Sequence, residues 1–161
     1  MGGITLVLIA HTVHVVLAGA WFGGVVFTML VVSPALGVMK WDEAERVGVR
    51  AVIGRRYALV GGVNLALLAV FAFTDGILGG FGPPLYAECA LLPLLFGLVA
   101  AHGAFFGRRL AALAEAERGS ASAEQAASFA RKRRSLQRMS VKVSWVNLVV
   151  SAAVLALAAN T

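Results

Sequence analysis

Apolar residues gather in four long stretches of this chain, separated by short polar, basic or glycine-rich segments. The four stretches cover about residues 4–32, 57–78, 86–106 and 139–159. Each one reaches the roughly 20 residues that a helix needs to cross about 30 Å of hydrocarbon. The pattern therefore predicts an all-α fold: an integral membrane four-helix bundle, in which residues 1–161 form a single transmembrane domain.

The composition supports a membrane protein. Of the 161 residues, 60% are hydrophobic and only 14% are charged, and the mean hydropathy is +0.85. An average soluble domain carries about 25% charged residues. The net charge of +6 would suggest a nucleic-acid partner in a soluble protein, but the basic residues fall in two blocks, a distribution typical of cytoplasmic loops. We therefore expect no nucleic-acid partner.

The two basic blocks predict the orientation in the membrane. They lie in segments 35–56 and 107–138 and extend to Lys142, whereas the Gly/Pro-rich turn at 79–84 contains no Lys or Arg. The positive-inside rule makes segments 35–56 and 107–138 cytoplasmic helical extensions, and it places the turn and both termini outside. The expected location is a bacterial-type inner (plasma) membrane, with anionic lipid headgroups as partners of the basic segments.

The first apolar stretch carries side chains that lipid contact does not require. His11 and His14 are three residues apart and therefore share one helix face, and Trp21 lies near the middle of the stretch. Ionisable residues inside a spanning helix usually face the protein interior and mark a functional site. The first helix is therefore the leading candidate to hold a site.

Depth along each helix, at a rise of about 1.5 Å per residue, separates the polar residues into two groups. The inner group, on the cytoplasmic side, includes His102 and Lys142. The outer group is His11, His14, Asp75, Glu88 and Cys89. Its two imidazoles can reach one ion, with the thiol as a soft further ligand or a carboxylate as a hard one. We expect a transition-metal site, with copper favoured, that serves transport or sequestration.

Two alternatives remain open. In the first, the chain is a membrane redox protein with haem b, in which His14 is the axial ligand and Trp21 and His102 are further candidate cofactor-binding residues. The estimated depths of His14 and His102 differ by roughly 15 Å, which argues against both histidines binding one iron. In the second, the protein is a structural or assembly partner without a cofactor, and its polar residues only join helices.

Catalytic motifs are missing from the sequence. It contains no nucleophile elbow, no phosphate-binding glycine loop and no pair of carboxylates within one apolar stretch, so enzymatic activity is not expected. Two other patterns, one of glycines and one of asparagines, instead predict contacts between helices. Gly19 and Gly23 form a small-xxx-small face that suits close packing or a homo-oligomer. Asn64 and Asn147, each between Val and Leu, are expected to form hydrogen bonds across helices.

The first helix resembles that of a known group of membrane proteins. His14 is followed seven residues later by Trp21, then by Phe22-Gly23-Gly24 and Phe27. This pattern resembles the CopD-like group of small bacterial membrane proteins, which includes the copper-resistance D domain and the HemJ type of protoporphyrinogen oxidase. The run Ser33-Pro34-Ala35-Leu36 and the run Arg55-Arg56-Tyr57 are similar to a related four-helix family of unassigned function. The resemblance implies that His14 binds copper or haem.

Overall fold

The structure, a computed structural model, describes residues 2–41 and 43–161, and every secondary-structure element in these ranges is a helix. The elements are α1 (Gly2–Phe27), η1 (Thr28–Val32), α2 (Ser33–Val38), α3 (Glu43–Gly79), α4 (Pro83–Ala100), η2 (Ala101–Gly107), α5 (Arg108–Arg118) and α6 (Ala123–Ala158). The segments η1 and η2 are π-helical. The prediction of an all-α fold is confirmed.

The eight elements form four long rods. The helices α1, η1 and α2 follow one another without a break, as do α4, η2 and α5, whereas α3 and α6 are rods by themselves. The rod of α1, η1 and α2 and the rod of α3 have 37 residues each, and the other two rods have 36, so each rod is about 55 Å long. All four are long and apolar enough to cross a membrane, and they exceed the roughly 30 Å of hydrocarbon.

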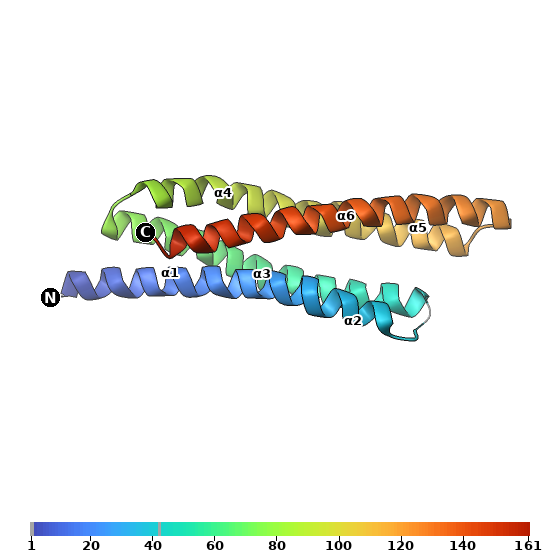
Figure 1. The fold of residues 1–161 in the computed structure, drawn as a ribbon, viewed down its shortest axis with the longest axis horizontal. Coiled ribbons are helices and arrows are strands. Elements are labelled where there is room, and N and C mark those ends of the chain that lie inside the picture. Colours follow the sequence, from blue (N-terminus) through green and yellow to red (C-terminus); the bar gives the residue numbers. More distant parts are fainter. Residues whose placement is uncertain (1, 42) are drawn as a thin grey trace.

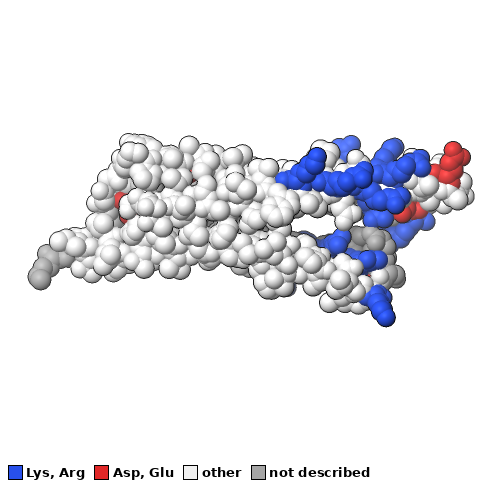
Figure 2. All heavy atoms as spheres, viewed as in Figure 1, with Lys and Arg blue, Asp and Glu red and all other residues white. Residues whose placement is uncertain are grey.

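The rods lie side by side in an up-and-down bundle (Figure 1). Helix α1 packs against α3 and α6, and α4 packs against the same two helices, so α1 and α4 face each other diagonally. One end, which we call the turn end, contains the start of α1, the turn between α3 and α4, and the end of α6. Lysine and arginine side chains gather at the opposite end, the basic end (Figure 2).

Large hydrophobic side chains occupy both the inside and the outside of the bundle. Leu65, Leu68, Leu95 and Val154 are fully buried in a core to which all four rods contribute. Many other aliphatic and aromatic side chains are exposed along the outer faces of the rods. Surface of this kind is characteristic of helices surrounded by lipid.

Glycines allow α1 and α3 to approach closely. A Cβ atom on Gly61 would lie 3.3 Å from the Trp21 ring, and a Cβ on Gly24 would lie 3.3 Å from the Tyr57 hydroxyl. A Cβ on Gly19 would lie 4.0 Å from Leu155, whereas Gly23 has no described atom within 4 Å of its Cβ position. Of the two residues proposed for an oligomer face, one therefore faces α6 within the same chain.

The turn between α3 and α4 holds the two helices at a fixed separation. Gly80 has φ = +98°, a conformation that favours glycine, and it ends α3. The Phe81 ring then folds over Gly76, where a side chain would overlap it. Prolines at the first positions of α4 start the next helix directly. This turn brings the last residues of α3 close to the first turns of α4.

The two asparagines do not form the expected bonds through their carbonyl groups. Oδ1 of Asn64 and Oδ1 of Asn147 are both buried without a hydrogen-bond partner among the described residues. Helices α3 and α6 each pack against α1 and α4, and among the described residues these neighbours present no donor to either oxygen. The prediction of cross-helix bonds accepted by these oxygens is wrong.

Candidate metal centre

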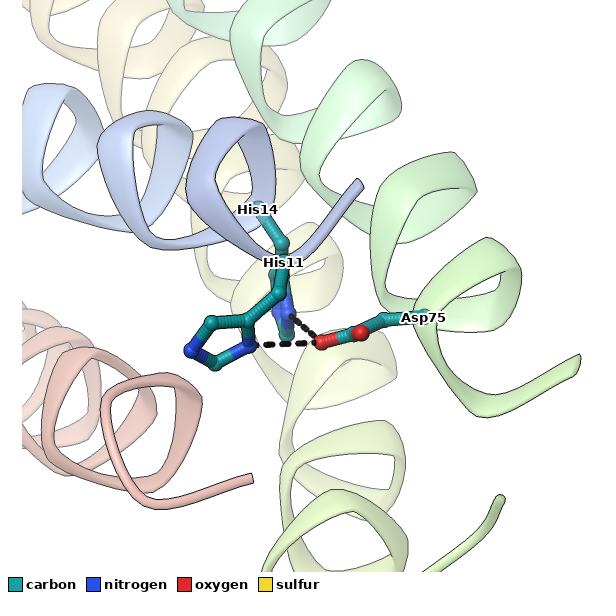
Figure 3. A group of neighbouring side chains, drawn as sticks. All are labelled: His11, His14 and Asp75. Carbon is teal, nitrogen blue, oxygen red and sulfur yellow. Dashed lines mark hydrogen bonds and ion pairs between the residues drawn. The ribbon is translucent and has the colours of Figure 1, made fainter. Parts of the chain in front are cut away.

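Polar side chains from three helices meet inside the turn end of the bundle. His11 and His14 project from the same face of α1, and Asp75 projects toward them from the last turns of α3 (Figure 3). Oδ2 of Asp75 lies 3.0 Å from Nδ1 of His11 and 3.1 Å from Nδ1 of His14. One carboxylate oxygen therefore contacts both imidazole rings.

Helix α4 supplies a fourth polar side chain from the diagonal position. Oε1 of Glu88 lies 2.8 Å from Nε2 of His14, and both side chains are completely buried. The second carboxylate oxygen of Glu88, Oε2, is also buried and has no hydrogen-bond partner among the described residues. Both ring nitrogens of His14 thus contact carboxylates, one from α3 and one from α4.

The four side chains form a continuous row of contacts from the surface to the interior. The exposed fraction of the side chain falls from 30% at His11 to 7% at Asp75 and to 0% at His14 and Glu88. The hydroxyl of Thr161 lies next to the outer members, 3.3 Å from His11 Nδ1 and 3.4 Å from Asp75 Oδ2. The surface end of this row of side chains is therefore polar and accessible, and its inner end is closed.

A pocket of about 440 Å³ lies at the surface end of this row of side chains. The polar part of its lining is His11, Asp75 and Thr161. The side chains of Ile4, Val7, Leu8 and Leu85 form apolar walls, and Gly79 and Gly80 complete the lining. Because His14 and Glu88 are fully buried, a solute in this pocket would meet His11 and Asp75 first.

No lysine or arginine lies near the two buried carboxylates in the sequence of the surrounding helices. The sequence has no Lys or Arg before Lys40, between Arg56 and Arg108, or after Lys142, and these gaps include all the residues around the site. The imidazoles of His11 and His14 are the basic side chains that contact the carboxylates. Buried charge of one sign is costly in an apolar environment, so the carboxylates need a positive partner, either the protonated imidazoles or a bound cation.

Three side chains bring possible metal-ligand atoms close together. One ring nitrogen each of His11 and His14 and one carboxylate oxygen of Asp75 all lie within 4.8 Å of one another. Two ligands at right angles around a metal, with bonds of about 2.1 Å, are about 3.0 Å apart, close to the two N–O separations found here. Two imidazoles and one carboxylate suit divalent ions such as copper, zinc and iron.

Glu88 contacts the ring nitrogen of His14 that faces away from Asp75. Histidines that bind metals usually donate their other ring N–H to a carboxylate or carbonyl, which fixes the tautomer and the ring orientation. Nε2 of His14 has such a partner in Oε1 of Glu88. The other ring nitrogen, Nδ1, faces Asp75, where a shared ion would bind.

Two further candidates, Cys89 and Trp21, lie outside this group of side chains. Cys89 is partly buried and packs against the apolar core, and its sulfur is not part of the group of possible ligands. The indole N–H of Trp21 donates to Ser151 Oγ at 2.9 Å, which places this ring in the contact between α1 and α6.

His102 is far from the other histidines. It lies in η2, where its Nε2 is 3.3 Å from Ser140 Oγ. It follows Glu88 by 14 residues along one continuous rod, a separation of about 20 Å. The structure therefore brings together four members of the outer group, leaves Cys89 outside it, and keeps His102 apart.

Sequence reasoning missed two residues. Ser151 follows Asn147 by four positions on an otherwise apolar helix, and this spacing was an available signal for a polar contact on one face. Thr161 gave no such signal, because its contact with the site depends on where the end of α6 lies relative to α1 and α3.

Comparison of the chain with protein-family models, with curated protein sequences and with solved structures finds no match. The function therefore has to be inferred from the fold and from the chemistry of the site.

Proposed function

We propose that this chain is an integral membrane protein that binds one divalent transition-metal ion, with copper favoured, through His11, His14 and Asp75. The observation that carries the proposal is the convergence of two imidazole nitrogens on one carboxylate oxygen at 3.0 and 3.1 Å in a largely buried site. The bound ion would be sequestered at the membrane or passed on from this site.

Residence in a membrane follows from the surface of the bundle. The four rods have apolar outer faces, and lysine and arginine are confined to one end. The positive-inside rule supports an orientation with the basic end in the cytoplasm, against anionic lipid headgroups, and with the turn end and its candidate metal ligands outside.

Charge balance supports a divalent ion. The carboxylates of Asp75 and Glu88 carry two negative charges, and neutral imidazoles at His11 and His14 add none. One divalent cation therefore neutralises the whole group, which matters in a region without Lys or Arg.

Ligand chemistry supports copper among the divalent ions. Imidazole nitrogen with one carboxylate oxygen follows the usual order of affinities, in which Cu(II) binds most tightly. The soft sulfur ligands that favour Cu(I) are missing from the group of donors. The resemblance of the His14–Trp21 pattern to the CopD-like group also favours copper over other divalent ions.

Metal analysis and Cu(II) titration of the purified protein in detergent test this proposal. We expect one equivalent per chain in the wild type, and His14→Ala should lose most of the affinity. His102→Ala is the matched control, because it removes a histidine outside the site, and it should bind like the wild type. Equal stoichiometry and affinity in the wild type and His14→Ala would contradict the proposal.

An absorption spectrum of the same samples separates metal from haem. Both ring nitrogens of His14 already contact carboxylates, so a haem iron would have to displace one of them. We expect no Soret band. A Soret band in the wild type that disappears in His14→Ala would replace the metal proposal with the haem alternative.

A further inference from the structure

The candidate metal centre has a pocket on one side and a layer of buried apolar side chains on the other. On the turn-end side, His11 and Asp75 line the pocket of about 440 Å³. On the other side, toward the basic end, each of the four rods places an apolar side chain in the core within the next turn or two. These are Ala18 on α1, Leu68 and Ala72 on α3, Leu92 on α4 and Val154 on α6.

These apolar side chains form a closed layer. They are 0–3% exposed and belong to one contiguous cluster, which continues inward through Leu65 and Leu95. None of these five side chains offers an oxygen or nitrogen ligand, and the buried Oγ of Ser151, three residues before Val154 on α6, already accepts from the Trp21 indole. A divalent ion that left His14 and Glu88 in this direction would lose its ligands and gain none within this layer, at a high desolvation cost.

From this contrast we infer that the ion enters and leaves the centre through the turn-end pocket alone, so that the protein is an outward-facing metal-binding site and not a transmembrane path. This inference rests on the proposed metal-binding function. It selects sequestration, or transfer to an acceptor on the outer side, over movement of the ion across the bundle.

The polar side of the pocket suits this role. The imidazole of His11 is partly exposed, and the hydroxyl of Thr161 lies beside both His11 Nδ1 and Asp75 Oδ2. An incoming hydrated ion would exchange water for these groups one at a time, and His14 is the last ligand that it reaches. The partly exposed ligand controls entry, and the buried one gives retention.

A tryptophan in the pocket wall tests the route. Leu8 lines the pocket and is largely exposed, so Leu8→Trp can narrow the opening without overfilling the core. Leu6→Trp is the matched control, because Leu6 is an exposed leucine on the same helix that does not line the pocket.

The measurement is stopped-flow loading of Cu(II) and its release to a chelator, for both variants and the wild type in detergent. Leu8→Trp should slow loading and release together by about tenfold, about 1.4 kcal/mol in the barrier, with little change in Kd. Leu6→Trp should match the wild type. Unchanged rates in Leu8→Trp would overturn the inferred route.

Sidedness can be tested on the wild type alone, which avoids dependence on a variant. In proteoliposomes loaded with Cu(II), an impermeant chelator added outside should strip the ion only from molecules whose basic end is protected from external trypsin. The same vesicles should accumulate Cu(II) no faster than protein-free vesicles. Stripping from trypsin-sensitive molecules, or protein-dependent uptake, would overturn the inference. Failure of the wild type to bind Cu(II) in detergent would instead refute the proposed function.

Discussion

At the scale of single residues, the site depends on how each side chain is oriented as well as on which side chains are present. His14 lies between two carboxylates, at 3.1 Å from Asp75 and 2.8 Å from Glu88, and it is fully buried. The neighbour of Glu88 on α4, Cys89, points about 100° away around the helix axis and packs with the core instead. Only one of these two adjacent residues can therefore contact His14.

Glu88→Gln should weaken Cu(II) binding without removing a metal ligand. The amide keeps the shape of the side chain but loses the negative charge that holds Nε2 of His14. Loss of such an outer partner typically costs about 10- to 100-fold in metal affinity. Competition titration measures the loss, and Cys89→Ser should bind as the wild type does. A Glu88→Gln affinity equal to that of the wild type would show that Glu88 has no positioning role.

Metal binding should weaken as the pH falls. An imidazole binds a metal only when it is neutral, so protons compete with the ion for His11 and His14 as the pH falls. The apparent Kd for Cu(II), measured from about pH 7.5 down to about pH 5.5, should rise in this range. A Kd independent of pH would speak against ligation by His11 and His14.

At the scale of elements, close packing of α1 against α3 sets the position of the histidine-bearing face. Trp21 packs over Gly61 and Tyr57 packs over Gly24, and the Trp21 indole also binds Ser151 on α6. These contacts fix the rotation of α1, and with it the direction in which His11 and His14 point.

Alanine substitutions at these glycines should destabilise the bundle. In Gly24→Ala and Gly61→Ala the new methyl group would lie 3.3 Å from a ring or hydroxyl atom, so the aromatic neighbour must move. Overpacking of this kind costs about 1–3 kcal/mol. Gly23→Ala, with open space around its Cβ position, is the control. Thermal unfolding in detergent should show lower midpoints for the first two variants only, and equal midpoints for all three would contradict this account of the packing.

The sequence was sufficient to predict the four rods and the depth of the polar residues. Long apolar stretches, basic blocks and a constant helical rise determine both, so Asp75 and Glu88 could be placed near the level of His11 and His14. Rotation of each helix about its axis could not be predicted, because it depends on packing against neighbours. For this reason Cys89 was included with Glu88, and Asn64 and Asn147 were expected to form bonds across helices that their Oδ1 atoms do not accept among the described residues.

At the scale of the whole molecule, the two ends of the bundle have opposite chemistry. The basic end holds the Lys and Arg side chains, with Arg133 on α6 paired to Glu117 on α5 at 2.9 Å. The turn end holds Asp75 and Glu88, which have histidines and no Lys or Arg as partners. Under the positive-inside rule, this separation supports the proposed orientation, with the basic end in the cytoplasm.

Labelling of single cysteines tests that orientation. In a Cys89→Ser background, Gly82→Cys in the turn should react with an impermeant maleimide added outside intact cells. Ser120→Cys, between α5 and α6, should react only after the membrane is opened. The reversed pattern would contradict the proposed orientation, and reaction of both positions in intact cells would contradict insertion of the bundle as proposed.

The central claim is that His11, His14 and Asp75 hold one divalent ion together. Electron paramagnetic resonance of the Cu(II)-loaded protein tests it most directly, because coupling to imidazole nitrogen reports the ligands themselves. We expect two coupled imidazoles in the wild type and in His102→Ala, and one at most in His11→Ala and in His14→Ala. A wild-type spectrum without imidazole coupling, or one that is unchanged in both His11→Ala and His14→Ala, would contradict it.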